Sequence, residues 1–262
     1  MPSSALHVAR TGLEAQDTRM RVIANNLANI GTTGFKRDRA DFAALAYQDT
    51  RVAGQQSTAE TAFAIGLNLG TGVSVQGTSR IDTQGTLNTT GNALDLALDG
   101  DGFFQVQLPS GELAYTRAGN FTLSADGQLV TAQGFTLEPA IQVPQGAQSI
   151  TVAPDGTVSA TLDGNTAAQQ LGQLTIASFA NPAGLQALGD NFLRETAASG
   201  AADVGPGGTN GRGGIRQGML EASNVNVVEE LVEMIEAQRA YEINSKMVSA
   251  VDEMLRNANQ TL

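Results

Sequence analysis

The 262-residue chain has no cysteine, no tryptophan and a single histidine. Without cysteine the protein has no disulfide framework, no thiolate metal site and no cysteine nucleophile. A catalytic triad or a histidine metal site would need partners for His7 that the sequence does not supply. We therefore expect His7 to occupy a solvated or interface position.

Long apolar runs and an excess of basic charge are also missing. No stretch approaches the roughly 18 apolar residues that a membrane-spanning helix needs. The N-terminus lacks the apolar core of a cleaved secretory signal, so we expect export, if it occurs, to use another route. The formal net charge of -11 argues against a nucleic acid or an anionic membrane as partner. The densest basic stretch, FKRDR at 35–39, is interrupted by Asp38 and is predicted to be a solvated connector.

Apolar residues recur every seven positions at the N-terminus, a pattern typical of a helix that packs against other helices. Two such series are present: Leu6, Leu13, Met20 and Leu27, and Ala9, Gln16, Ile23 and Ile30, with one polar member. The stretch NNLANIGTTG at 25–34 then ends the helix, because asparagine is a poor helix former and glycine suits left-handed backbone positions. We predict that Gly31 and Gly34 turn the chain out of the helix.

The C-terminus shows the same spacing over a longer stretch. The series is Val227, Met234, Tyr241, Val248 and Leu255. Asn226 and Glu229 have the spacing of a helix N-cap and its capping-box partner, so we predict one helix over 226–258. Further apolar residues, including Leu231 and Ile235, lie outside this series, and one partner helix therefore cannot cover the apolar surface.

Between the helices, residues 70–205 consist of short apolar or alternating runs that end in turn residues, which predicts a mostly antiparallel β domain. Asp126-Gly127 and Asp155-Gly156 are hairpin signals. Residues 36–72 and 196–218 have little periodicity, and the second of these is predicted to be a flexible glycine-rich loop. We thus predict an α+β protein with three parts: a helical coiled-coil core at 1–34 and 221–262, an extended or β connector at 35–85 and 205–220, and an outer β domain at 86–204.

Two stretches resemble ligand-binding motifs without matching them. LDGDGFF, with Asp99 and Asp101, lacks the alternating oxygen ligands of a calcium loop and is predicted to be a tight turn. GPGGTNGRGG at 205–214 lacks the Gly-Lys-Ser/Thr of a phosphate loop. We therefore predict no catalytic, metal-binding or cofactor-binding residues, and no small-molecule substrate.

Four stretches together resemble the flagellar axial proteins, the family of rod and hook components. They are NNLANIGTTGFKRDRADF at 25–42, TGNALDLALDGDGFFQV at 90–106, YTRAGNFTLSADGQLVTAQGF at 115–135 and EASNVNVVEELVEMIEAQRAYEINSKMV at 221–248. They lie at both ends and in the middle of the chain, in the order of the family. Within the family the resemblance is strongest to the distal rod component, because residues 47–73 look like the extended insertion of that component.

The resemblance implies a structural subunit of a hollow tube in the periplasm, with terminal helices in an inner coiled-coil tube and the β domain outside. The implied partners are further copies of the chain, the proximal rod, the hook, the peptidoglycan and outer-membrane ring proteins and the flagellar type III export apparatus. The implied assembly residues are Leu6, Leu13, Met20, Ile23, Asn25, Asn26, Leu27, Asn29, Ile30, Val227, Leu231, Met234, Ile235, Tyr241, Val248 and Leu255.

Other functions remain open at this stage. A proximal rod or hook component of the same family is one alternative, and a secreted β-rich enzyme or binding protein is another. Heptads at both termini favour assembly, because an enzyme has no need of two self-association stripes.

Overall fold

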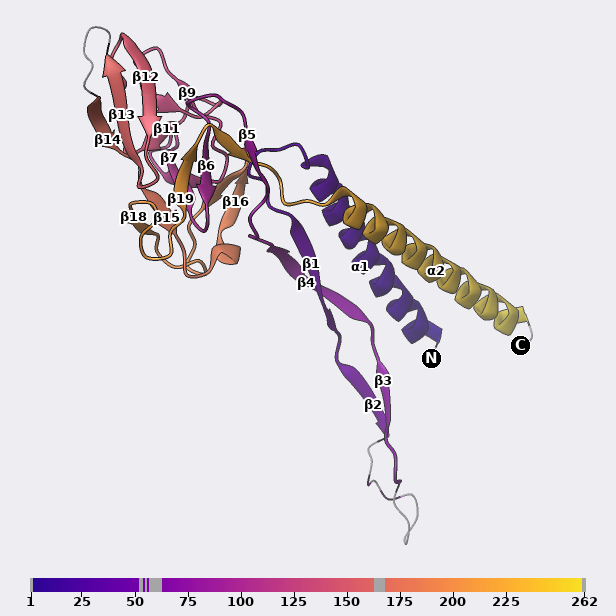
Figure 1. Cartoon of the computed structure of the whole chain (residues 1–262). Coiled ribbons are helices and arrows are strands. Elements are labelled where there is room, and N and C mark those ends of the chain that lie inside the picture. The colour runs from indigo at the N-terminus through magenta and orange to yellow at the C-terminus, as the bar shows by residue number, and fades with distance from the viewer. Residues whose placement is uncertain (1, 52–53, 55, 57–62, 163–167, 261–262) are drawn as a thin grey trace. The chain divides into compact units, whose positions relative to one another are not determined.

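The computed structural model describes residues 2–51, 54, 56, 63–162 and 168–260 and consists of two compact units (Figure 1). The first unit contains Met1–Leu27, Asp38–Ser79 and Asn226–Leu262, and the second contains Ala28–Arg37 and Arg80–Val225. Helices lie in the first unit and most strands in the second, which confirms the predicted α+β class. Residues 205–220, predicted to belong to a connector, are grouped with the second unit.

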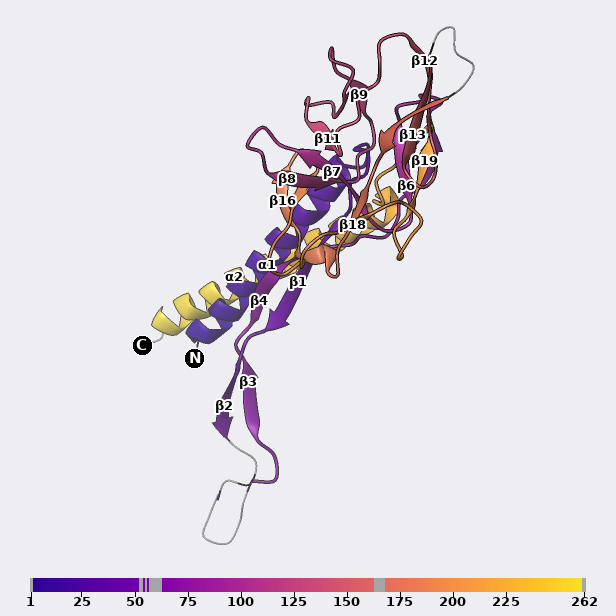
Figure 2. The same ribbon diagram turned by 90° about the vertical axis from the view of Figure 1, so that its left-hand side faces the viewer.

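Two long antiparallel helices, α1 (Pro2–Ala28) and α2 (Val227–Gln260), lie side by side in the first unit (Figures 1 and 2). Asn226 caps α2 as predicted, since its side-chain oxygen accepts a hydrogen bond of 3.1 Å from the Val228 amide. A small residue brings the helices close together: a Cβ added to Gly12 would lie 3.0 Å from the side-chain nitrogen of Asn244.

The first unit also contains an arm of two-stranded ribbons (Figure 2). Strand β1 (Asp38–Ala44) pairs with β4 (Val73–Arg80), and β2 (Tyr47–Arg51) pairs antiparallel with β3 (Leu67–Gly70). In the low-periodicity segment at 36–72, the described residues 38–44, 47–51 and 67–70 thus form strands. Almost every residue of β2 and β3 is exposed, so these strands lack the alternation that a one-sided sheet imposes on a sequence.

Short strands build the second unit. They are β5 (Leu87–Thr89), β6 (Leu96–Asp99), β7 (Phe103–Gln107), β8 (Leu113–Thr116), β9 (Thr122–Leu123), β10 (Leu129–Val130), β11 (Thr136–Glu138), β12 (Ala147–Val152), β13 (Thr157–Leu162), β14 (Gln169–Gln173), β15 (Ile176–Ser178), β16 (Gln186–Gly189), β17 (Phe192–Arg194), β18 (Asp203–Gly205), β19 (Gly214–Gln217) and β20 (Met219–Glu221), with a 3-10 turn, η1, at Pro182–Gly184.

The main sheet has the order β16-β17-β8-β7-β11-β10-β9, and β15 joins β7 to β18. Three smaller sheets are β12-β13-β14, β19-β6 and β20-β5. The ladders described in this unit are antiparallel, as predicted. They bury two apolar clusters, and in the larger one Phe104 and Phe121 meet edge to face at 5.1 Å.

Two predicted hairpin turns are confirmed. Gly127, between β9 and β10, has φ +78°, and Gly156, between β12 and β13, has φ +91°. These left-handed values suit glycine because it lacks a Cβ.

The glycine-rich segment at 205–214 is folded, which corrects the prediction of a flexible loop. The Arg212 guanidinium is buried and pairs with the Asp203 carboxylate at 2.7 Å. The same side chain donates to Thr209 Oγ1 and to the Pro206 carbonyl. Glycine is needed beside it, because a Cβ on Gly205 would lie 2.4 Å from the guanidinium.

Replacing Gly119 by alanine tests the packing of the second unit. The added Cβ would lie 1.5 Å from the Leu96 carbonyl oxygen, so the backbone would have to move. We expect Gly119→Ala to lower the free energy of unfolding by about 1–3 kcal/mol in urea denaturation followed by circular dichroism. Gly31→Ala is the control, because nothing lies within 4 Å of its added Cβ. Equal stability of the two variants would contradict the close approach.

Candidate assembly interface

Helix α2 exposes most of its large apolar side chains to solvent. Val228 is 69% exposed and Ile243 is 59% exposed. The other members of this exposed apolar surface are Val227, Leu231, Val232, Ile235, Tyr241, Met247 and Met254. Apolar surface on this scale in one chain indicates a site for a further protein surface.

The covered side of α2 carries small and polar residues together with partly buried apolar residues such as Met234 and Val248. Ala237 is completely buried there, and Glu230 is nearly so. Arg19 on α1 reaches Glu233 at 3.4 Å and Glu236 at 3.7 Å. The nine exposed apolar residues of α2 lie outside this covered side and remain available to other partners.

The predicted heptad residues of α2 therefore differ in exposure. Val227 and Tyr241 are exposed, whereas Met234 and Val248 are partly buried. Leu255 lies in α2, but its side chain is outside the described part of the chain. The heptad spacing thus identified the apolar positions without identifying which of them the chain covers itself.

Helix α1 is more fully covered than α2. Ile23 is buried, and Leu6, Leu13, Met20 and Leu27 are partly buried. Ile30 is exposed and lies in the second unit, beyond the end of α1. The interface role predicted for these residues remains a prediction, with Ile23 the member least available to a partner.

Asn26 fastens α1 to the start of β1. Its side-chain amide donates to the Asp38 carbonyl and its side-chain oxygen accepts from the Asp38 amide, both at 2.9 Å. It also donates to the Glu230 carboxylate on α2 at 3.2 Å. The structure thus gives Asn26, predicted as an interface residue, contacts within its own chain. Asn25 is exposed, and Asn29 accepts from the Thr32 hydroxyl at 3.1 Å.

The two glycines predicted at the chain exit differ. Gly34 has φ +67°, and an added Cβ would lie 2.6 Å from the Arg117 carbonyl carbon, so only glycine fits without rearrangement. Gly31 has no positive φ and open space around it. The exit therefore depends on Gly34.

A buried ion cluster of Lys36, Arg117 and Glu221 follows this exit in the second unit. Lys36 Nζ lies 2.5 Å from Glu221 Oε1, and Arg117 Nη1 lies 3.1 Å from Glu221 Oε2. The Glu221 side chain is wholly buried and also accepts from the Gly85 amide at 2.9 Å. The stretch at 35–39 was predicted to be a solvated connector, and the burial of Lys36 corrects this.

The charges of this Glu221 cluster sum to +1. Burial lowers the pKa of Lys36 below its usual value, against the opposing effect of the hydrogen bond and charge of Glu221, and the Arg117 charge lowers it further. Loss of the Lys36 proton would leave the buried cluster neutral. Local sequence reasoning missed the cluster because Lys36 and Glu221 are 185 positions apart.

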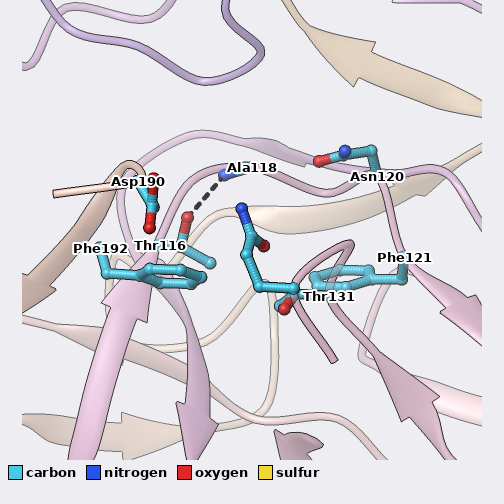
Figure 3. A pocket seen from close by; sticks show the side chains of 8 residues that line it. Thr116, Ala118, Asn120, Phe121, Thr131, Asp190 and Phe192 are labelled. Carbon is cyan, nitrogen blue, oxygen red and sulfur yellow. Dashed lines mark hydrogen bonds between the residues drawn. The ribbon is translucent and has the colours of Figure 1, made fainter. Parts of the chain in front are cut away.

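A small pocket in the second unit has an aromatic floor and a polar rim (Figure 3). Its volume is about 40 Å³, and its lining includes Phe121, Phe192, Asn120, Gln133 and Asp190. Ligand pockets measure roughly 300–1,000 Å³, so this pocket is too small for an ordinary substrate.

Metal and membrane features are absent from the described residues. No group of three or more His, Cys, Asp or Glu side chains there could hold a metal ion. No helix in that part of the chain is long and apolar enough to cross a bilayer. Asp99, considered at first as a calcium ligand, instead accepts hydrogen bonds of 2.9 and 3.1 Å from Arg216.

A long helix with an exposed apolar surface, joined to a β unit with its own core, is typical of a structural subunit that associates with other protein surfaces. Family models match the chain in three places: "Flagella basal body rod protein" at 6–36, "Flagellar hook protein FlgE/F/G D1 domain" at 97–160 and "Flagellar basal body rod FlgEFG protein C-terminal" at 216–261.

Similar proteins match over nearly the whole chain. The flagellar basal-body rod protein FlgG of Buchnera aphidicola subsp. Acyrthosiphon pisum is 50% identical, and that of Caulobacter vibrioides is 46% identical, each over 98% of both chains. The FlgG protein of Bacillus subtilis is 38% identical over 96% of both chains. The chain belongs to the family of flagellar basal-body rod proteins.

Replacing Glu221 by glutamine tests the energetic role of the Glu221 cluster. The variant leaves Lys36 and Arg117 buried without a counter-charge, so we expect a loss of about 3–5 kcal/mol in the free energy of unfolding. Glu112→Gln removes a half-exposed carboxylate 3.9 Å from Arg194 and should cost less than about 1 kcal/mol. Chemical denaturation measures the free energy of unfolding of both variants. Equal losses of stability in the two would contradict the energetic role of the Glu221 cluster.

The pH dependence of stability tests the lowered pKa of Lys36. Between that pKa and the ordinary value of 10.5, the unfolded chain binds more protons at this site than the folded chain. Stability contributed by the site must therefore rise with pH across this window. We expect the stability difference between wild type and Lys36→Met to shift in favour of wild type as pH rises toward 10.5. A shift in the opposite direction would show that the pKa is raised.

Proposed function

We propose that the protein is a structural subunit of the distal rod of the bacterial flagellum. Copies polymerise through α1 and α2 into a hollow helical tube that transmits torque from the motor to the hook across the periplasm. The exposed apolar surface of α2 carries this proposal, and the full-length similarity to proteins named flagellar basal-body rod protein FlgG supports it.

The occupant proposed for the exposed surface of α2 is a second copy of the chain. Helix α1 pairs with α2 through Arg19 and Asn26, and the nine large apolar residues of this surface stay exposed. Each large apolar side chain that becomes fully buried contributes about 1.5–3 kcal/mol. Nine such residues would stabilise a helical coiled-coil core repeated along a polymer.

The proposed neighbours are the proximal rod protein below and the hook protein above. Ring proteins of the peptidoglycan and outer membrane would surround the tube, and the flagellar type III export apparatus would deliver the subunits. In this role the protein has no catalytic activity and binds no nucleic acid, cofactor or small substrate. The acidic net charge supports the absence of a nucleic-acid partner.

A proximal rod component is the second candidate. The flagellar basal-body rod protein FlgF of Caulobacter vibrioides is 36% identical over 99% of this chain and 98% of its own. The FlgG protein of the same organism is 46% identical, which favours the distal rod.

The arm formed by β1–β4 and β2–β3 is proposed to stiffen the polymer. Tyr47 is 64% exposed and Ile65 is 76% exposed, and Leu67 and Leu69 are also exposed. A two-stranded ribbon of this kind is marginally stable alone. Burial of these side chains along a neighbouring copy would order the ribbon and resist sliding between copies. We call residues 47–70 of this arm the strut; of these, 52–53, 55 and 57–62 lie outside the described residues.

Replacing Ile243 by aspartate tests assembly through α2. The side chain is exposed in the single chain, so the subunit should keep its stability. In the polymer the carboxylate would be buried without a partner at every interface, at a cost of several kcal/mol each. We expect no tubes by electron microscopy and no pelleting on centrifugation. Leu123→Asp, the same kind of apolar-to-acidic change at an exposed position of the second unit, should polymerise normally; tubes from Ile243→Asp at the wild-type yield would refute the proposal.

A double substitution, Ile65→Ser with Leu69→Ser, tests the strut. Both side chains are exposed, so the hairpin should persist in the single chain. The proposal expects tubes that form but bend more, measured as a shorter persistence length in electron micrographs. Leu113→Ser, an exposed apolar change in the second unit, is the control and should leave the stiffness unchanged. Tubes of wild-type stiffness from the double variant would identify the arm as a passive loop.

A further inference from the structure

The chain passes between its two units at four points. On the side of the second unit, these connections belong to only three segments: residues 28–37, the residues that follow Arg80, and the residues that end at Val225. Any force carried along the chain between the units must therefore enter the second unit through these three segments. The bonds among them decide whether the segments bear that force separately or together.

The outgoing segment, residues 28–37, and the returning segment, the residues that end at Val225, are bonded directly. The Gly34 amide donates to the Glu221 carbonyl at 2.8 Å, and the Arg37 amide donates to Asn224 Oδ1 at 2.8 Å. The ion pair of Lys36 and Glu221 lies between these two bonds. Main-chain and side-chain bonds thus join the two segments at Gly34, Lys36 and Arg37.

The segment at 81–86 is bonded to the outgoing segment. The Ile81 amide donates to the Arg37 carbonyl at 2.9 Å. Lys36 Nζ donates to the Thr83 carbonyl at 2.8 Å, in addition to its bond with Glu221. One lysine therefore links all three segments.

The segment at 81–86 is also bonded to the returning segment. The Asn224 side-chain nitrogen donates to the Ile81 carbonyl at 2.8 Å and to the Thr83 carbonyl at 3.0 Å. Glu221 accepts from the Gly85 amide, as described above. The Ala222 amide donates to the Thr86 carbonyl at 2.9 Å. Each of the three segments is thus bonded to both of the others.

We propose that residues 34–37, 81–86 and 221–224 form a load-sharing junction, in which a pull on any one segment is distributed over all three. Lys36, Glu221 and Asn224 are its linking side chains, because each bonds two other segments. Arg117 ties the junction to the rest of the β unit through Glu221 and the Gly100 carbonyl at 2.8 Å. Hydrogen bonds loaded together resist more force than bonds that are broken one at a time. The benefit to a torque-carrying polymer rests on the proposed function, whereas the mechanics belong to the single chain.

Amide hydrogen exchange in the full chain tests whether the junction opens as one unit. In Asn224→Ala only the Arg37 amide loses its direct acceptor. A shared junction predicts at least tenfold faster exchange at the amides of Gly34, Gly85 and Ala222 as well. Asn181→Ala is the matched control, since it removes a side-chain bond to Ala198 in the same unit and should change none of these amides. Acceleration confined to Arg37 would overturn the proposal.

Pulling a single molecule tests load sharing directly. Because the chain has no cysteine, Arg239→Cys on α2 and Ser110→Cys between β7 and β8 provide unique attachment points. We expect wild type to release the junction in one step, and Asn224→Ala to release it in separate steps at a force lower by a third or more. If Asn224→Ala does not fold, Lys36→Met replaces it, with the same expected release in separate steps at lower force. An unchanged single step at the wild-type force in the folded variants would overturn the proposal, and it would leave assembly through α2 unaffected.

Discussion

The exposed apolar surface of α2 is the constraint on which the rest of the structure depends. A long helix that shows so many apolar side chains to water is not a stable end state for a single chain. The pairing of α1 and α2 leaves this surface open, because it uses Ala237, the small residue Gly12 and the ion pairs of Arg19. The first unit therefore has its own internal contacts and still presents an apolar surface for association. Association with further copies is the simplest way in which that surface becomes buried.

The β unit differs from α2 because its apolar residues are buried within one chain. Its inward-facing residues, including Phe104, Phe121 and Ile176, are almost fully buried. Tight contacts at glycines such as Gly119 allow strands and turns to approach closely. A unit of this kind keeps its shape whether or not the helices have found partners. The chain thus combines a self-sufficient unit with one that depends on assembly, and the bonds around Glu221 hold the connecting segments together.

Local patterns in the sequence predicted the parts of the fold that local physics determines. The cap at Asn226, the hairpin turns at Gly127 and Gly156 and the α+β class each depend on neighbouring residues, and the structure confirms them. The Glu221 cluster could not be predicted in this way, because its members come from distant parts of the chain and each looks like a surface charge in its own stretch. An extended or β connector was predicted at 35–85, where the arm lies, but its strand pairing was not, because strands exposed on both faces carry no alternating pattern. The folded loop around Arg212 was missed because glycine content alone does not reveal a buried guanidinium.

Hydrogen exchange of α2, compared between verified monomer and polymer, tests the central claim most directly. The account predicts that peptides from Val227–Gln260 exchange rapidly in the monomer and become strongly protected in the polymer, because other copies then cover the helix. Peptides from the β core around Phe104 should be protected equally in both states. Strong protection of α2 already in the monomer, or none in the polymer, would contradict assembly through this helix.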